Sequence, residues 1–231
     1  MRVRVAHTPS DKLTAPVGVV IDVIRATTTI TAALASGYER VICTTEVAEA
    51  RAIAEQEGDC VLGGERHAVK IEGFRFGNSP TEYLSPVAKT LVFSTTNGTP
   101  LLVSAAERCE TVLLGSLAAL DAVVEAVRAT GTDDVVLLCA GVSGELAIDD
   151  LYVAGRIAEQ LGGDLRDSAW AAIRLARSYG SSLEGLEASQ SGRDLHRAGL
   201  KSDIVWCSRE SHLGVVPTFR RLLGTAAEVT L

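Results

Sequence analysis

The stretch VGVVIDVIRATT, residues 17–28, decides the fold. Residues 17–22 form a β-branched apolar run that predicts a strand, and residues 28–36 predict a helix directly behind it. Asp22 and Arg25 stand where the strand gives way to the helix. Ligands of parallel α/β sheets sit beyond the carboxyl ends of the strands, so this junction is the first place to expect chemistry.

Working outward, β-branched runs continue to alternate with Ala-rich stretches of helical character. Strands are predicted at residues 41–44, 90–95, 111–114, 135–139 and 204–207. Helices are predicted at residues 47–57, after Gly98, and at residues 117–130 and 149–161. The alternation predicts an α/β fold with three layers, in which helices flank a mainly parallel or mixed sheet. Residues 1–231 are expected to form a single domain, and two α/β lobes dividing near residue 115 are the alternative.

One stretch departs from this pattern. Residues 63–86 are rich in Gly, Pro and polar residues and show no clear periodicity. A loop of this length inside a compact domain is usually functional or disordered. We expect it to build part of a site, and a simple surface excursion is the alternative.

Composition excludes several classes of protein. The net charge of −7 argues against a nucleic-acid partner, which would require clustered Lys and Arg. No apolar run approaches the roughly 20 residues of a membrane span, so a cytoplasmic protein without a membrane partner is expected. The five cysteines include no CxxC pair, which indicates small buried hydrophobes rather than disulfides or structural zinc. A homodimer is compatible with the size and apolar content.

The segment after the first quoted strand carries the strongest candidates. The Asp22 carboxylate is placed to hold a divalent cation, because hard cations prefer oxygen ligands. Arg25 can offer its planar fork to a phosphate or another anion. The hydroxyls of Thr27 and Thr28 could add donors at the helix start. The alternative is structural, with Asp22 or Thr27 capping the helix and Arg25 solvated.

Further candidates follow other predicted strands or lie in the long loop. Glu65 and Arg66 form a second acid–arginine pair, or else a surface ion pair of little worth. Asn78 and Ser79 offer polar side chains on a turn. A cradle for an anion is predicted at Thr95, Thr96, Asn97 and Gly98, for which a turn with a helix cap is the alternative.

Asp149 and Asp150 begin a predicted helix. Negative charge there stabilises the helix by itself. The functional alternative is that one of them binds metal opposite Asp22 or acts as general base for an attacking water.

Familiar phosphatase signatures are missing. A Cys-x5-Arg phosphatase would need Arg at position 145, where Glu145 stands. Ile24 occupies the second acidic position of an Asp-x-Asp motif. Neither a P-loop nor a Gly-x-Ser-x-Gly elbow occurs.

Taken in order, the motifs resemble those of the 2-phosphosulfolactate phosphatase family across essentially the whole chain. They comprise DVIRATTT (22–29), GER (64–66), GF (73–74) with GNSPTEY (77–83), TTNGT (95–99), CAG (139–141), the helix of Asp149 and Asp150, and residues 191–203. The resemblance implies an α/β phosphohydrolase that depends on Mg²⁺. The reaction that names the family is the hydrolysis of 2-phospho-3-sulfolactate, a small anionic phosphate ester, to 3-sulfolactate and phosphate on the way to coenzyme M.

Within that resemblance we assign roles as hypotheses. Asp22 and one of Glu65, Asp149 or Asp150 hold Mg²⁺. The arginines Arg25 and Arg66 bind the phosphate and the remote anions. The ester is oriented by Asn78, Ser79, Thr96 and Asn97, and a water or Cys139 attacks phosphorus. A phosphatase acting on another small anionic ester, or a non-catalytic anion-binding protein, is the alternative.

Overall fold

A computed structural model describes residues 1–96 and 98–231 of the chain. Within that part the strands form one mixed sheet of eleven, ordered β5-β4-β6-β3-β11-β10-β7-β2-β8-β1-β9. They are β1 (Arg2–Ala6), β2 (Ala15–Ile21), β3 (Arg40–Thr44), β4 (Cys60–Arg66), β5 (Val69–Lys70), β6 (Thr90–Ser94), β7 (Cys109–Gly115), β8 (Asp134–Cys139), β9 (Asp164–Leu165), β10 (Thr218–Leu223) and β11 (Ala226–Thr230).

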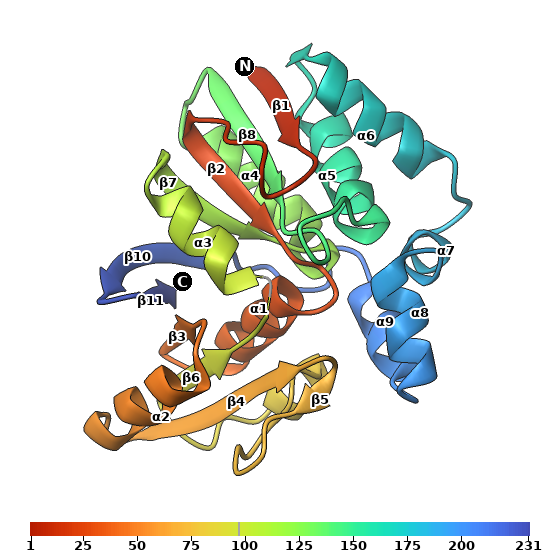
Figure 1. Ribbon diagram of the computed structural model, residues 1–231. Helices are drawn as coiled ribbons and strands as arrows, with labels where there is room; N and C mark the ends of the chain where they lie inside the picture. The colour runs from red at the N-terminus through yellow and green to blue at the C-terminus, as the bar shows by residue number, and fades with distance from the viewer. Residues whose placement is uncertain (97) are drawn as a thin grey trace.

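Up to α5 the helices alternate with the strands as the sequence pattern predicts, and four unpredicted helices, α6 to α9, then follow one another (Figure 1). They are α1 (Ala26–Ser36), α2 (Val47–Gln56), the 3-10 turn η1 (Pro80–Tyr83), α3 (Gly98–Ala106), the 3-10 turn η2 (Leu117–Ala119), α4 (Leu120–Ala129), α5 (Ile148–Leu161), α6 (Asp167–Arg177), α7 (Ser182–Glu187), α8 (Gln190–Arg197) and α9 (Lys201–Cys207).

Two parallel groups of strands make up most of the sheet. One contains β7, β2, β8, β1 and β9, and the other contains β4, β6 and β3. The antiparallel hairpin of β10 and β11 lies between them, with β11 paired to β3 and β10 paired to β7 at Thr218 and Leu113. The predicted mixed α/β sheet flanked by helices is therefore confirmed, whereas the division near residue 115 stays a prediction.

The alternation of side chains along each strand explains why helices cover both faces of the sheet. Val19 and Leu137 face a core formed with α4, α5 and α6, whereas Val20 and Leu138 face a second core formed with α1 and α3. Successive strand side chains point to opposite faces, so a continuous apolar run is buried on both sides of the sheet. The wholly buried β8 is such a strand.

The sequence prediction of a strand at residues 204–207 is wrong, because these residues form the end of α9. Ile204, Trp206 and Cys207 are buried while Val205 is 44% exposed, which is the spacing of a helix face. A run of four apolar residues carries too little periodicity to separate strand from helix. The long loop is also more regular than predicted, since β4 extends to Arg66, β5 returns beside it, and η1 follows.

Helices and loops from several parts of the chain lie around the carboxyl end of β2. The β2–α1 junction lies near the middle of the molecule, with the group α7, α8 and α9 on one side and the β4–β5 hairpin below (Figure 1). In the part of the chain that the structure describes, none of the helices has the length and apolar character needed to traverse a bilayer.

Candidate active site

A cleft of about 590 Å³ opens at this edge of the sheet. Five separate segments build it: the β2–α1 junction, the β4–β5 hairpin with the loop after it, the β6–α3 loop, the β8–α5 loop and α8. Its wall contains Asp22, Ile24, Arg25, Glu65, His67, Ala68, Asn78, Thr95, Thr96, Val142, Ser143, Ser191, Asp194, Leu195, Arg197 and Ala198. Segments distant in sequence thus meet where the α/β topology predicts a site.

Asp22 is the acidic centre of the cleft. It follows β2 directly, and its Oδ1 accepts the Ala26 N–H at the start of α1 at 3.4 Å. Burial raises the pKa of Asp22 well above its ordinary value, and repulsion from Asp149 raises it further. A carboxylate so placed would be favoured by a nearby cation.

Gly98 lies directly against this carboxylate. A Cβ added to Gly98, the first residue of α3, would lie 2.8 Å from Asp22 Oδ2 and 3.0 Å from the Ala26 Cβ. Only a residue without a side chain allows α3 to begin so close to Asp22. This close approach gives Gly98 a structural role, and its substrate-binding role stays a prediction.

The two aspartates that begin α5 are buried behind the cleft but have different surroundings. Asp150 accepts backbone N–H groups of Val23 and Gly141, each at 2.9 Å, so it ties the β2–α1 and β8–α5 loops together. Asp149 Oδ1 has no hydrogen-bond partner within the described part of the chain. Burial raises the pKa of both carboxyls, and hydrogen bonds, that of the Ser191 side chain foremost, partly offset this for Asp149. A buried oxygen without a partner, such as Asp149 Oδ1, is costly unless a proton or a cation occupies it.

Arg25 is anchored by Asp203, which ends the last segment of the family resemblance but has no role predicted from the sequence. Its Nη1 donates to Asp203 Oδ2 at 2.6 Å, and the Ser79 hydroxyl donates to Asp203 Oδ1 at 2.7 Å. The side chains of Arg25 and Asp203 are only 4% and 2% exposed. Asp203, from α9, therefore connects α1 to the loop before η1 and fixes how Arg25 enters the cleft.

Glu65 and Arg66 are adjacent in sequence but have different surroundings in the fold. Glu65 lines the cleft, where its Oε1 accepts the Thr96 N–H and hydroxyl and its Oε2 accepts the Ala68 N–H. Arg66 is outside the cleft wall, and its guanidinium donates to the carbonyls of Glu65 and Thr45 and to the Ser94 hydroxyl. The predicted anion-binding role of Arg66 thus competes with three protein partners.

The β4–β5 turn places His67 in the cleft wall. His67 and Ala68 both have positive φ, 53° and 64°. Two-residue hairpin turns of this kind favour Asn and Gly, and other residues there carry backbone strain. Strain of this type is common at functional sites, which draws attention to His67.

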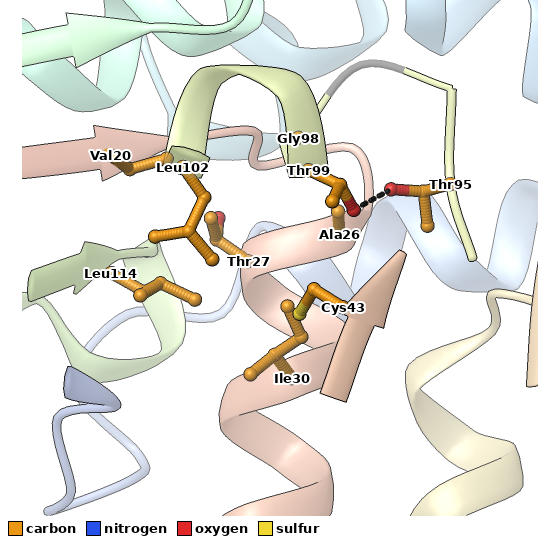
Figure 2. Close-up of a pocket in the computed structure, with 10 residues that line it drawn as sticks. All are labelled: Val20, Ala26, Thr27, Ile30, Cys43, Thr95, Gly98, Thr99, Leu102 and Leu114. Atoms are coloured by element: carbon orange, nitrogen blue, oxygen red, sulfur yellow. Dashed lines mark hydrogen bonds between the residues drawn. The ribbon is translucent and has the colours of Figure 1, made fainter. Parts of the chain in front are cut away.

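The α1 threonines stabilise the junction. Thr27 Oγ1 donates to the Asp22 carbonyl at 3.0 Å, and Thr28 Oγ1 donates to the Val23 carbonyl at 2.8 Å. Figure 2 shows Thr27 with Leu102 and Leu114 around a small, mainly apolar cavity of about 10 Å³ between α1 and α3. The two threonine hydroxyls satisfy carbonyls just after β2 and do not cap α1, and Arg25 is buried rather than solvated as the structural alternative assumed.

Thr95 lines both that cavity and the cleft. Its hydroxyl shares a 3.5 Å hydrogen bond with Thr99, drawn in Figure 2. Asn78 lines the cleft and leaves its buried Oδ1 without a partner among the described residues. The predicted role of Asn97 lies outside those residues. Cys139 is fully buried, and burial raises the pKa of its thiol well above the ordinary value.

The predicted residues therefore divide into two sets. Those in the cleft wall are Asp22, Arg25, Glu65, Asn78, Thr95 and Thr96. Those around or behind it are Thr27, Thr28, Arg66, Ser79, Gly98, Cys139, Asp149 and Asp150. The sequence reasoning gave no role to the α8 residues Ser191, Asp194 and Arg197, although their segment forms part of the family resemblance.

An open α/β sheet with a polar cleft at its carboxyl edge, lined by both carboxylates and arginines, has the arrangement of an active site in an α/β enzyme. The model of the 2-phosphosulpholactate phosphatase family matches residues 3–221. The chain is 39% identical to a probable 2-phosphosulfolactate phosphatase of Thermus thermophilus, with 98% of each chain covered. It is 37% identical to a protein of the same name from Deinococcus radiodurans, over 94% of this chain and 93% of that one. The chain belongs to the 2-phosphosulfolactate phosphatase family.

Proposed function

We propose that this protein hydrolyses 2-phospho-3-sulfolactate to 3-sulfolactate and phosphate. Relatives aligned over nearly its whole length carry that name with the qualifier "probable". The observation that carries the proposal is the cleft itself, where Asp22 and Arg25 meet hydroxyl and amide side chains from four other segments. Phosphoryl transfer needs such positioning and charge stabilisation more than it needs a covalent nucleophile.

The donor set of this site fits a magnesium ion. Asp22 and Asp149 are buried carboxylates that repel each other, and Asp149 Oδ1 lacks a partner among the described residues. No group of three or more His, Cys, Asp or Glu suited to a metal occurs in the described part of the chain. Mg²⁺ does not require one, because it usually keeps several waters and binds one or two carboxylates together with substrate phosphate. When bound, Mg²⁺ would offset the charge of the phosphoryl oxygens.

The other cleft residues then have defined tasks. Arg25, held by Asp203, presents its charge to the phosphate beside Asp22. Glu65 accepts the N–H and the hydroxyl of Thr96, and so it fixes the β6–α3 loop beside the cleft. Asn78 also lines the cleft, where its side-chain NH2 group would donate to an oxygen of the ester and orient it.

Water is the proposed nucleophile. The Cys139 thiol is buried within the core cluster that includes Ile21 and Leu137, and the raised pKa keeps it protonated near neutral pH. Since thiolate rather than thiol is the reactive form, attack by Cys139 is disfavoured.

The test is phosphate release from 2-phosphosulfolactate with added Mg²⁺ or with a chelator, using wild type, Asp22→Asn and the control Asp133→Asn. Asp133 is exposed at the amino end of β8, at the opposite edge of the sheet. We expect loss of turnover only in Asp22→Asn and with chelator. In a separate thermal melt, Mg²⁺ should stabilise the wild type and Asp133→Asn more than Asp22→Asn, because a ligand that binds the native state raises its stability. Full activity of Asp22→Asn would refute the assignment.

A further inference from the structure

The cleft must present several positive groups if its ligand carries several anions, as the proposed substrate does. Among the described residues, the basic side chains in its wall are Arg25, His67 and Arg197. Arg66, the second arginine expected from the sequence, is outside that wall and donates to two carbonyls and a hydroxyl. A second arginine for the ligand must therefore come from elsewhere in the fold, and Arg197 is the one in the wall.

Arg25 and Arg197 occupy contrasting environments. Arg25 follows Asp22 in the β2–α1 junction and is fixed and buried by Asp203. Its place beside the acidic centre suits the reacting phosphate. Arg197 comes from the last turn of α8, on the side of the molecule formed by α7, α8 and α9 (Figure 1), and its side chain is 68% exposed.

The ion pair of Arg197 with Asp194 is weak enough for an incoming anion to replace Asp194. Its Nη1 lies 3.1 Å from Asp194 Oδ1, one helical turn earlier, and the Asp194 side chain is 44% exposed. Exposed pairs of this kind contribute little, so an incoming anion can take the guanidinium with little loss. Asp194 also lines the cleft, so its carboxylate would repel an anion that failed to reach Arg197.

We propose that Arg197 is the residue that recognises the remote sulfonate of the substrate. This inference rests on the proposed function and gives that site its specificity. Arg25 and the Asp22 side of the cleft receive the phosphate, whereas Arg197 on α8 pairs with the sulfonate through its planar fork. An ester without the sulfonate leaves Arg197 with Asp194 and gains nothing from it.

Arg193 provides a matched control. It lies four residues earlier on the same helix and is also exposed, but it is not in the cleft wall. It lines a second groove beside α8, which Arg197 lines as well. Its guanidinium donates to the Ala188 carbonyl and to Gln190 Oε1. Arg193→Gln removes the same charge from α8 without removing a group from the cleft wall.

The experiment compares kcat/KM for 2-phosphosulfolactate and for 2-phospholactate in wild type, Arg197→Gln, Arg197→Lys and Arg193→Gln. We expect Arg197→Gln to lower kcat/KM for the sulfonated ester by about 10- to 100-fold, the usual worth of a charge-assisted hydrogen bond, and to change that for phospholactate by less than about 3-fold. Arg197→Lys should recover part of the preference, and Arg193→Gln should match wild type. An equal loss on both esters, or the same loss in Arg193→Gln, would overturn the specificity role.

A binding measurement separates this proposal from the proposed function. Calorimetric titration with 3-sulfolactate and with lactate reports sulfonate recognition even if no variant releases phosphate. Weaker binding of 3-sulfolactate by Arg197→Gln than by wild type, by 10-fold or more, would support the role of Arg197 whatever the turnover. Unchanged binding would reject it, while absence of phosphate release from wild type with both esters would reject the phosphatase reaction alone.

Discussion

Removing the Asp203 carboxylate should leave the charge of Arg25 buried without a partner. The ion pair is 2.6 Å long and almost completely shielded from water. Breaking such a pair by deleting one partner typically costs about 3–5 kcal/mol. For a protein of this size each kcal/mol corresponds to roughly 2–4 °C, so Asp203→Ala should melt about 6–20 °C below wild type.

The measurement is a double-mutant cycle by urea denaturation, with Asp203→Ala, Arg25→Ala and the double variant. Because the double variant removes both charges, its free energy of unfolding should fall by less than the sum of the single losses, with a coupling of about 1–3 kcal/mol. Asp203→Asn, which keeps the shape and an acceptor for Ser79, should be the milder single change. Additive losses, or a cost below about 1 kcal/mol for Asp203→Ala, would refute the view that this pair holds α9 against the β2–α1 junction.

Three further predictions follow from single contacts. Gly98→Ala places a methyl group 2.8 Å from Asp22 Oδ2, so kcat/KM for phosphate release should fall about tenfold or more as the carboxylate shifts; wild-type kinetics would contradict the close approach. Burial alone would raise the pKa of Asp134, yet its hydrogen bonds from Arg2 and Arg4 hold that pKa below the ordinary value of 3.8. Asp134→Asn should therefore lose about 1 kcal/mol of unfolding free energy at pH 7. The difference in unfolding free energy between variant and wild type should shrink as the pH falls below 3.8 through the native pKa, which denaturation at pH 7 and pH 3 tests. A difference that grows in acid would contradict the prediction. Cys139→Ala should keep kcat within about threefold while lowering stability by about 1 kcal/mol, since the thiol is a buried core group; loss of turnover in a folded variant would instead indicate attack by sulfur.

Much of the fold follows from local sequence. The apolar runs that became β2, β3, β6, β7 and β8 were predicted close to their observed bounds because both faces of these strands are buried. The C-terminal hairpin of β10 and β11 gave no comparable signal, since β10 is largely exposed or half-buried. The strand predicted at residues 204–207 is wrong because four apolar residues do not separate a strand from a helix, and only the folded helix shows adjacent Trp206 and Cys207 both buried.

The candidate site, like the fold, follows only partly from local sequence. By itself, the sequence determined that Asp22 and Arg25 end a buried strand, and hence that they reach the sheet edge where ligands bind. It also determined the family, through motifs spread along the chain. These features depend on residues close together in sequence or on their order, so no knowledge of packing is needed.

Only the tertiary structure decided which side chains form ion pairs and hydrogen bonds with each other. Arg25 meets Asp203, 178 residues away, and Arg197 enters the cleft wall while Arg66, within a favoured motif, is taken up by nearby carbonyls. Ion pairs and hydrogen bonds form between side chains that packing brings within about 3 Å, and sequence patterns do not encode that proximity. The physical reason is the docking of α8 and α9 beside the β2–α1 junction, which sets the partners of each charge.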